Sequence, residues 1–77
     1  MNKNGWISRK EAQVIKDTYT KGTKIHLVSM RDDFGSRLNG LTGVVDHVDD
    51  AGQIHMNWEN GSCLALSPGV DIFEIIQ

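Results

Sequence analysis

The clearest signal along the chain is a strict alternation of hydrophobic and polar residues past its middle. Ile54, Met56 and Trp58 are each separated by one polar residue, which is the period of a strand with one buried face. The flanking residues 49–52 and 59–61 are rich in Asp, Asn and Gly, and such residues favour tight hairpin turns. The pattern therefore predicts a strand bounded by two hairpin turns.

Similar apolar stretches recur on both sides of this strand. The predicted strands, in chain order, cover residues 23–30, 41–48, 53–58, 62–66 and 72–76. Five short strands joined by tight turns favour a closed barrel, because closure leaves no unpaired strand edge. The expected fold class is mostly β, a small five-stranded barrel preceded by one short N-terminal α-helix.

The predicted helix rests on a capping box. Ser8 is followed three residues later by Glu11, so that each side chain can bond to the backbone N–H of the other residue. A helix over residues 9–18 should follow, and a helix this short is marginal alone. It must therefore dock on the rest of the chain or on a second copy. The apolar side chains for docking are Ala12, Ile15 and Tyr19, with Trp6 just before the cap.

Composition narrows the class of protein mainly by exclusion. The 77 residues, of which 39% are hydrophobic, are expected to form one domain, with a helix at about residues 8–19 and a barrel at about 22–77. No apolar run approaches the roughly 18 residues of a membrane span, so we expect no membrane partner. Cys63 is the only cysteine, which excludes an internal disulfide and a cysteine-based zinc site.

The net charge of -2 conceals two parts of opposite sign. Residues 1–24 hold six basic and two acidic residues, a balance of +4, whereas residues 25–77 hold two basic and eight acidic residues, a balance of -6. The simplest interpretation is a solvated basic helix beside a solvated acidic barrel. An acidic barrel disfavours neutralisation of a nucleic-acid backbone. It suits a basic partner surface, such as the nucleic-acid channel of a host protein.

Three stretches, residues 22–30, 43–62 and 64–71, carry a resemblance to a known family. The middle stretch contains the run D-D-x-G-x-I-H-x-N-W-x-N-G-S at residues 49–62. In these stretches the chain resembles a family of small SH3-like barrel proteins of unknown function, found in phages, plasmids and conjugative elements of Gram-positive bacteria. The resemblance implies an SH3-like barrel in the cytoplasm of a bacterial host, and it implies no particular activity.

The loop after the first strand lacks the prolines usual in that family, and it is a candidate binding site. Phe34 and Leu38 are apolar residues in an otherwise polar segment. They either tuck over the mouth of the barrel or form an exposed anchor beside arginine, a residue type that is common in binding hot spots. The candidate partner-binding residues of this loop are Arg31, Asp32, Asp33, Phe34 and Arg37.

The two hairpin turns supply a second group of candidates. Asp49 and Asp50 suit a turn in which they bond their own backbone, and two carboxylates are too few for a calcium loop. Asn60 and Gly61 suit the positive φ angles of a hairpin turn. The alternative is a polar surface for a ligand or a protein partner. Its candidate residues are Asp49, Asp50, His55, Asn57, Asn60 and Ser62.

Metal and catalytic chemistry find little support in the sequence. His26, His47 and His55 would converge if the first three strands were adjacent, and Asp46 could then complete a zinc site. Histidines at outward strand positions are more often plain surface residues. No motif presents a serine as a nucleophile, and Cys63 is expected as a reduced thiol on the outer face. We therefore expect no enzyme activity, no metal and no cofactor.

Three functions are consistent with these features. The first is a non-enzymatic binding protein of a phage or mobile element that inhibits a host or defence-system protein, as a counter-defence (anti-CRISPR-like) factor does. The second is an oligomeric sponge that sequesters a nucleotide immune signal, with Arg31, Arg37 and the basic helix contacting phosphate. The third is a nucleic-acid-binding accessory module. We expect the first, and we also expect a homodimer formed through Trp6, Ile15 and Tyr19 of the N-terminal segment.

Overall fold

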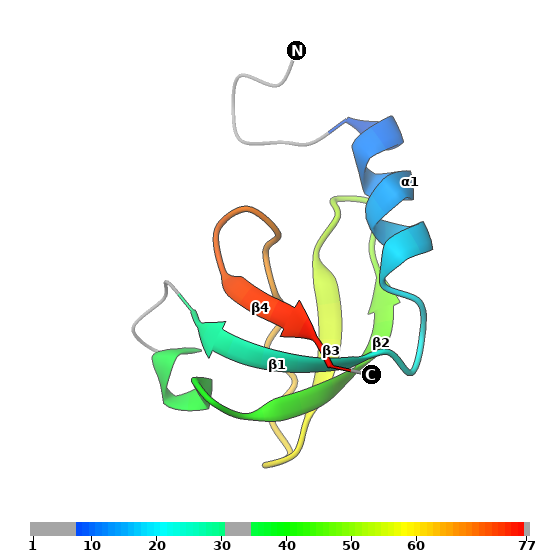
Figure 1. The fold of residues 1–77 in the computed structure, drawn as a ribbon. Coiled ribbons are helices and arrows are strands. Elements are labelled where there is room, and N and C mark those ends of the chain that lie inside the picture. Colours follow the sequence, from blue (N-terminus) through cyan, green and yellow to red (C-terminus); the bar gives the residue numbers. More distant parts are fainter. Residues whose placement is uncertain (1–7, 31–34, 77) are drawn as a thin grey trace.

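The computed structural model describes residues 8–30 and 35–76. The fold is mostly β, with one short helix and an open antiparallel sheet of four strands in the order β3-β2-β1-β4 (Figure 1). The elements, in chain order, are α1 (Arg9–Thr18), β1 (Lys24–Ser29), the 3-10 helix η1 (Gly35–Leu38), β2 (Thr42–Val48), β3 (Ile54–Trp58) and β4 (Ile72–Ile75). Four of the five predicted strands are therefore present, each shorter than expected by one or two residues.

The strand predicted over residues 62–66 is wrong. The chain is irregular there, and its backbone bonds to β3 in one bridge between Leu66 and Ile54 and in a hydrogen bond from the N–H of Trp58 to the carbonyl oxygen of Ser62 at 2.9 Å. The reason is that side chains occupy the backbone groups of Leu64. The indole Nε1 of Trp58 donates to the carbonyl oxygen of Leu64 at 2.9 Å, and the N–H of Leu64 donates to Oγ of Ser62 at 3.5 Å. The backbone groups of Leu64 thus bond to side chains, where those of a paired strand residue would bond to the neighbouring strand.

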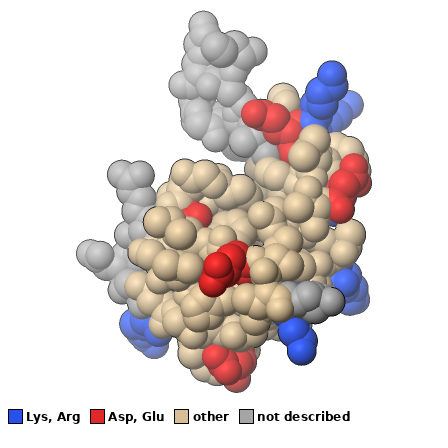
Figure 2. Space-filling view, viewed as in Figure 1, with Lys and Arg blue, Asp and Glu red and all other residues tan. Residues whose placement is uncertain are grey.

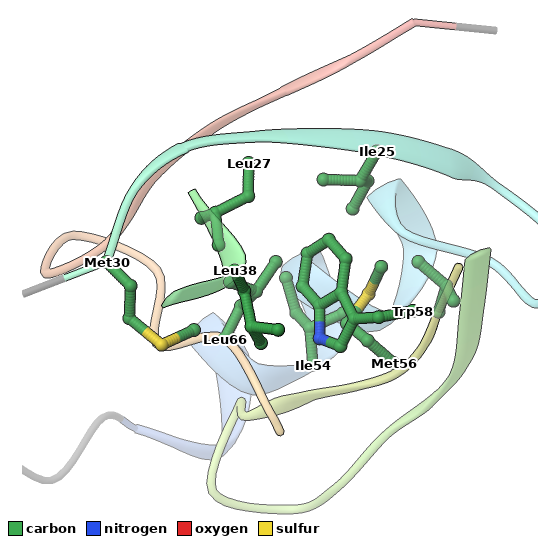
Figure 3. Close-up of a cluster of buried hydrophobic side chains, with 9 residues drawn as sticks. Ile25, Leu27, Met30, Leu38, Ile54, Met56, Trp58 and Leu66 are labelled. Carbon is green, nitrogen blue, oxygen red and sulfur yellow. The ribbon is translucent and has the colours of Figure 1, made fainter. Parts of the chain in front are cut away.

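The core lies on one face of the sheet, where the alternating pattern predicts it. Ile54, Met56 and Trp58 of β3 are buried against Ile25 and Leu27 of β1 (Figure 3). Such burial stabilises the fold by roughly 1.5–3 kcal/mol for each large apolar side chain. The remaining buried members of this cluster are Met30, Leu38, Val45 and Leu66.

Helix α1 begins and ends at the residues predicted from its capping box. Oγ of Ser8 accepts from the N–H of Glu11 at 3.0 Å, and the carboxylate of Glu11 accepts from the N–H of Ser8 at 2.8 Å. The helix docks on its own chain, because Ala12 is buried and Ile15 and Tyr19 pack against the core. Figure 1 shows α1 at one end of the sheet, beside the turn between β2 and β3.

The loop between β1 and β2 contains η1, which ends at Leu38. For Leu38 the sequence left open a buried position and an exposed anchor. Leu38 is only 4% exposed, so it is tucked into the core. Residues 31–34, which include the candidates Arg31, Asp32, Asp33 and Phe34, lie outside the described residues, as does Trp6.

The second hairpin turn needs one correction. Among the described residues only glycines have positive φ angles. At this turn Gly61, with φ of 88°, supplies the left-handed conformation alone, and Asn60 does not share it. Asn60 acts through its side chain instead, since its Oδ1 accepts from the N–H of Ser62 at 3.0 Å.

Within the described part of the chain, no helix is long and apolar enough to cross a membrane.

Candidate functional site

A β-bulge in β2 brings a cluster of hydrogen-bonded polar side chains together on the outer face of the sheet. Val45 pairs with Met56, but the next registered pair is His47 with His55, so Asp46 is an extra residue. A bulge of this kind shifts the alternation of side chains by one position. Val45 therefore points into the core while His47 points outward, next to His55 of β3. Without the bulge, strict alternation would send His47 to the same face as Val45.

The two imidazoles are stacked, and each is held by a carboxylate. Their ring centroids are 4.4 Å apart and their planes differ by 6°. Nδ1 of His47 donates to Oδ2 of Asp46 at 2.6 Å, and Nε2 of His55 donates to Oδ2 of Asp49 at 2.8 Å. The other oxygen of Asp49 accepts from the backbone N–H groups of Ala51 and Gln53, both at 2.9 Å. The turn thus fixes Asp49, and Asp49 fixes His55.

The carboxylates of this cluster are held in their charged form. The hydrogen bond from His47 lowers the pKa of Asp46 below its ordinary value. For Asp49, partial burial acts to raise the pKa, but the hydrogen bonds from His55, Gln53 and Ala51 outweigh it and leave the pKa lowered. Both groups therefore carry negative charge at neutral pH.

Asn57 extends the cluster along β3. It is exposed on the same outer face as His55, because side chains two residues apart in a strand share a face. Beside it lies a hollow of about 290 Å³, which is also lined by Lys24, Val44 and Glu59. We call the outward side chains of this region the hairpin face, and its members are Asp46, His47, Asp49, His55 and Asn57.

The hairpin face has polar groups but no catalytic arrangement within the described residues. The hydrogen bonds described for His47 and His55 go to carboxylates rather than to a serine or cysteine, so they activate no nucleophile. His26 does not join them, since it pairs with Thr42 at the opposite end of β2. No group of three or more His, Cys, Asp or Glu side chains in the described part of the chain is arranged to hold a metal ion. Cys63 is exposed, as predicted.

The other sequence candidates are scattered. Asp50 lies in the same turn as Asp49 but reaches α1, where its Oδ1 is 2.6 Å from Nζ of Lys16. That hydrogen bond lowers the pKa of Asp50.

Asn60 and Ser62 lie at the far end of β3 and bond to nearby backbone groups. Arg37 is exposed in η1, which lies between β1 and β2 and belongs to neither hairpin turn. The structure therefore brings together Asp49, His55 and Asn57.

Sequence reasoning omitted Asp46 and His47 from the candidate binding residues. The signal that could have found them is the turn itself. A five-residue connection from Asp49 to Gln53 places His47 directly opposite His55. Strict alternation obscures this pairing, because it keeps Val45 and His47 on one face. Val45 and Val48 both pack in or against the core. Two residues, Asp46 and His47, separate them in the sequence, whereas strict alternation allows one or three. This spacing indicates an extra residue in the strand.

Comparisons with known proteins give a family but no closer relative. No curated protein and no solved structure matches the chain. The family model of a domain of unknown function, DUF4314, matches residues 8–76, which run from the cap of α1 to just beyond β4. The chain therefore belongs to the DUF4314 family.

Proposed function

We propose that the protein is a non-enzymatic binding protein that inhibits a protein of its bacterial host, and that the hairpin face contacts this partner. The observation that carries the proposal is the exposed pair of stacked imidazoles with its two bonded carboxylates. The side chains of Asp46 and His47 are 44% and 58% exposed, and those of Asp49 and His55 are 36% and 39% exposed. Ligands of small-molecule sites are mostly enclosed, so an open polar face of this kind better suits a macromolecule.

The rigidity and charge of the face favour a basic protein surface as its partner. Both hydrogen-bonded carboxylates are ionised, and the turn backbone holds Asp49 in place. A preorganised group loses little conformational freedom on binding. Fixed negative charges attract and orient a partner that carries Lys and Arg. A nucleic-acid backbone, in contrast, would be repelled by Asp46 and Asp49.

We take the sheet to be part of an SH3-like barrel. The two hydrogen bonds between Ile54 and Leu66, at 2.8 and 2.9 Å, support this, because they continue the sheet beyond β3. We place the protein in the cytoplasm of a host cell, encoded by a phage or other mobile element and directed against a defence system. The sequence resemblance described above supports that setting.

Sequestration of a nucleotide is the second candidate function, and a groove beside α1 favours it. The groove has a volume of about 450 Å³, and Arg9 and Lys16 line it together with Gln13. Asp50 lies in the same groove and bonds to Lys16, which offsets one of the two positive charges. A nucleotide that is retained by freshly purified protein in native mass spectrometry would favour this function over the first.

A capture experiment tests the first function. The tagged protein is incubated with nuclease-treated bacterial lysate, and the retained proteins are identified by mass spectrometry. The main one is then purified and titrated against the wild type and against Asp46→Lys. We expect roughly tenfold weaker binding for this variant, as for other charge reversals at an interface.

The matched control is Asp17→Lys, which makes the same change of charge on an exposed face of α1. It should leave the dissociation constant unchanged. The proposal fails if no protein is retained, or if Asp46→Lys binds as tightly as Asp17→Lys.

A further inference from the structure

The C-terminal segment, residues 70–76, carries most of the exposed large apolar side chains of the described chain. Six large hydrophobic side chains of the described residues are exposed, and four of them fall within residues 70–76. Ile72 is the most exposed of the six, at 61%. Figure 2 shows that most of the face that carries β4 is formed by uncharged residues, with acidic side chains near its centre and Lys and Arg side chains at its margins. Apolar patches of this kind usually mark an interaction surface. The four side chains are Val70, Ile72, Ile75 and Ile76.

The backbone of β4 is open along one edge. β4 is the last strand of the sheet and pairs only with β1 among the described strands. The N–H of Ile76 donates to the carbonyl oxygen of Lys24, so Ile75 and Ile25 form a pair without mutual hydrogen bonds. Leu27, opposite Phe73, also directs its backbone away from β4, toward Leu41 and Gly40. The N–H and C=O groups of Phe73 and Ile75 therefore point to the open edge.

The exposed side chains lie on both faces of this edge. Phe73 and Ile75 are opposite Leu27 and Ile25, whose side chains face the core. Glu74 is opposite His26 on the outer face, and Ile72 shares that face by alternation. A partner lying flat on one face would cover only half of these side chains. An added strand would continue both faces and would also satisfy the open backbone groups.

We propose that the added strand is β4 of a second copy, paired antiparallel about a twofold axis. Such an interface is self-complementary, since each copy supplies the same apolar strand and the same open edge. A register that places Phe73 opposite Phe73 of the second copy sets Glu74 opposite Ile72, so that the two carboxylates are not opposed. A domain of this size buries only about 60% of its unfolded surface, and the dimer buries more.

This interface replaces the helix as the expected dimer contact. Ile15 and Tyr19, which we expected to contact a second copy, pack against the core of their own chain. Tyr19 also makes an edge-to-face contact with Phe73, with ring centroids 5.7 Å apart. The proposed dimer leaves the hairpin face open, because β3 and β4 are at opposite edges of the sheet.

The mass in solution tests the proposal. Light scattering or native mass spectrometry should give twice 8.6 kDa for the wild type at a concentration of about 100 µM. Ile75→Lys places a charge on the open edge and should return the mass to that of one chain. Val14→Lys is the matched control, because Val14 is equally aliphatic and 59% exposed, but on α1. It should remain a dimer.

Hydrogen exchange provides a readout that needs no variant. In the dimer the amides of Phe73 and Ile75 should be protected as strongly as that of Glu74, and on dilution to monomer only Glu74 should stay protected. A monomeric wild type would overturn the proposal. So would a dimer that survives Ile75→Lys, and so would fast exchange at Phe73 and Ile75 in a dimer.

Discussion

At the scale of single residues, Gly43 has no room for a side chain. It lies in β2 between Ile25 and Trp58. A Cβ at this position would be 2.7 Å from Cε3 of Trp58 and 2.9 Å from the carbonyl oxygen of Asn57. The φ angle of Gly43 is not in the left-handed region, so the position requires space rather than an unusual backbone conformation. The indole ring of Trp58 occupies that space.

Gly43→Ala should therefore destabilise the protein by about 1–3 kcal/mol, as overpacking of a well-packed core generally does. Neither neighbour can move easily, because one is a backbone atom and the indole is anchored by its hydrogen bond to Leu64. Urea denaturation followed by Trp fluorescence measures the free energy of unfolding. Gly43→Ser should cost more than Gly43→Ala, and equal midpoints for wild type and Gly43→Ala would contradict the prediction.

At the scale of elements, the sequence predicts best what depends on neighbouring residues. The bounds of α1 follow from the capping box of Ser8 and Glu11, and the buried face of β3 follows from alternation. The sequence predicts poorly what depends on contacts between elements. The irregular path around Leu64 results from the indole of Trp58, six residues away. The bulge at Asp46 depends on pairing with β3, and the stacked histidines follow from that bulge.

The cap of α1 makes a quantitative prediction. Ser8→Ala removes the oxygen that accepts from the N–H of Glu11, and loss of such a cap costs about 1 kcal/mol. The change should appear as a lower free energy of unfolding in urea, monitored by circular dichroism. Ser8→Asp is the control, because Asp caps helices as well as Ser does and should retain the stability. A loss of equal size in both variants would show that another interaction of Ser8 matters.

At the scale of the whole molecule, the turn between β2 and β3 contacts both the outer face of the sheet and helix α1. Asp49 holds His55 on the outer face, and the neighbouring Asp50 holds Lys16 of α1 across 34 positions in the sequence. One turn therefore contacts both the hairpin face and the helix. If β4 forms the dimer, two hairpin faces are presented by one assembly, and a partner with two sites would bind both with higher avidity.

The same turn makes the whole molecule sensitive to acid in a predictable direction. In the folded protein the pKa of Asp49 lies below the ordinary value of 3.8, to which it returns on unfolding. A group with a lowered folded pKa adds stability that is fully present above the unfolded pKa and is lost as the pH falls through the folded pKa. The free energy of unfolding should therefore decrease as the pH falls below about 4. Asp49→Asn is less stable at neutral pH but cannot take up this proton, so its free energy should fall less steeply over the same range. Urea titrations at several pH values measure both slopes, and parallel slopes for wild type and Asp49→Asn would rule out a contribution from this carboxylate.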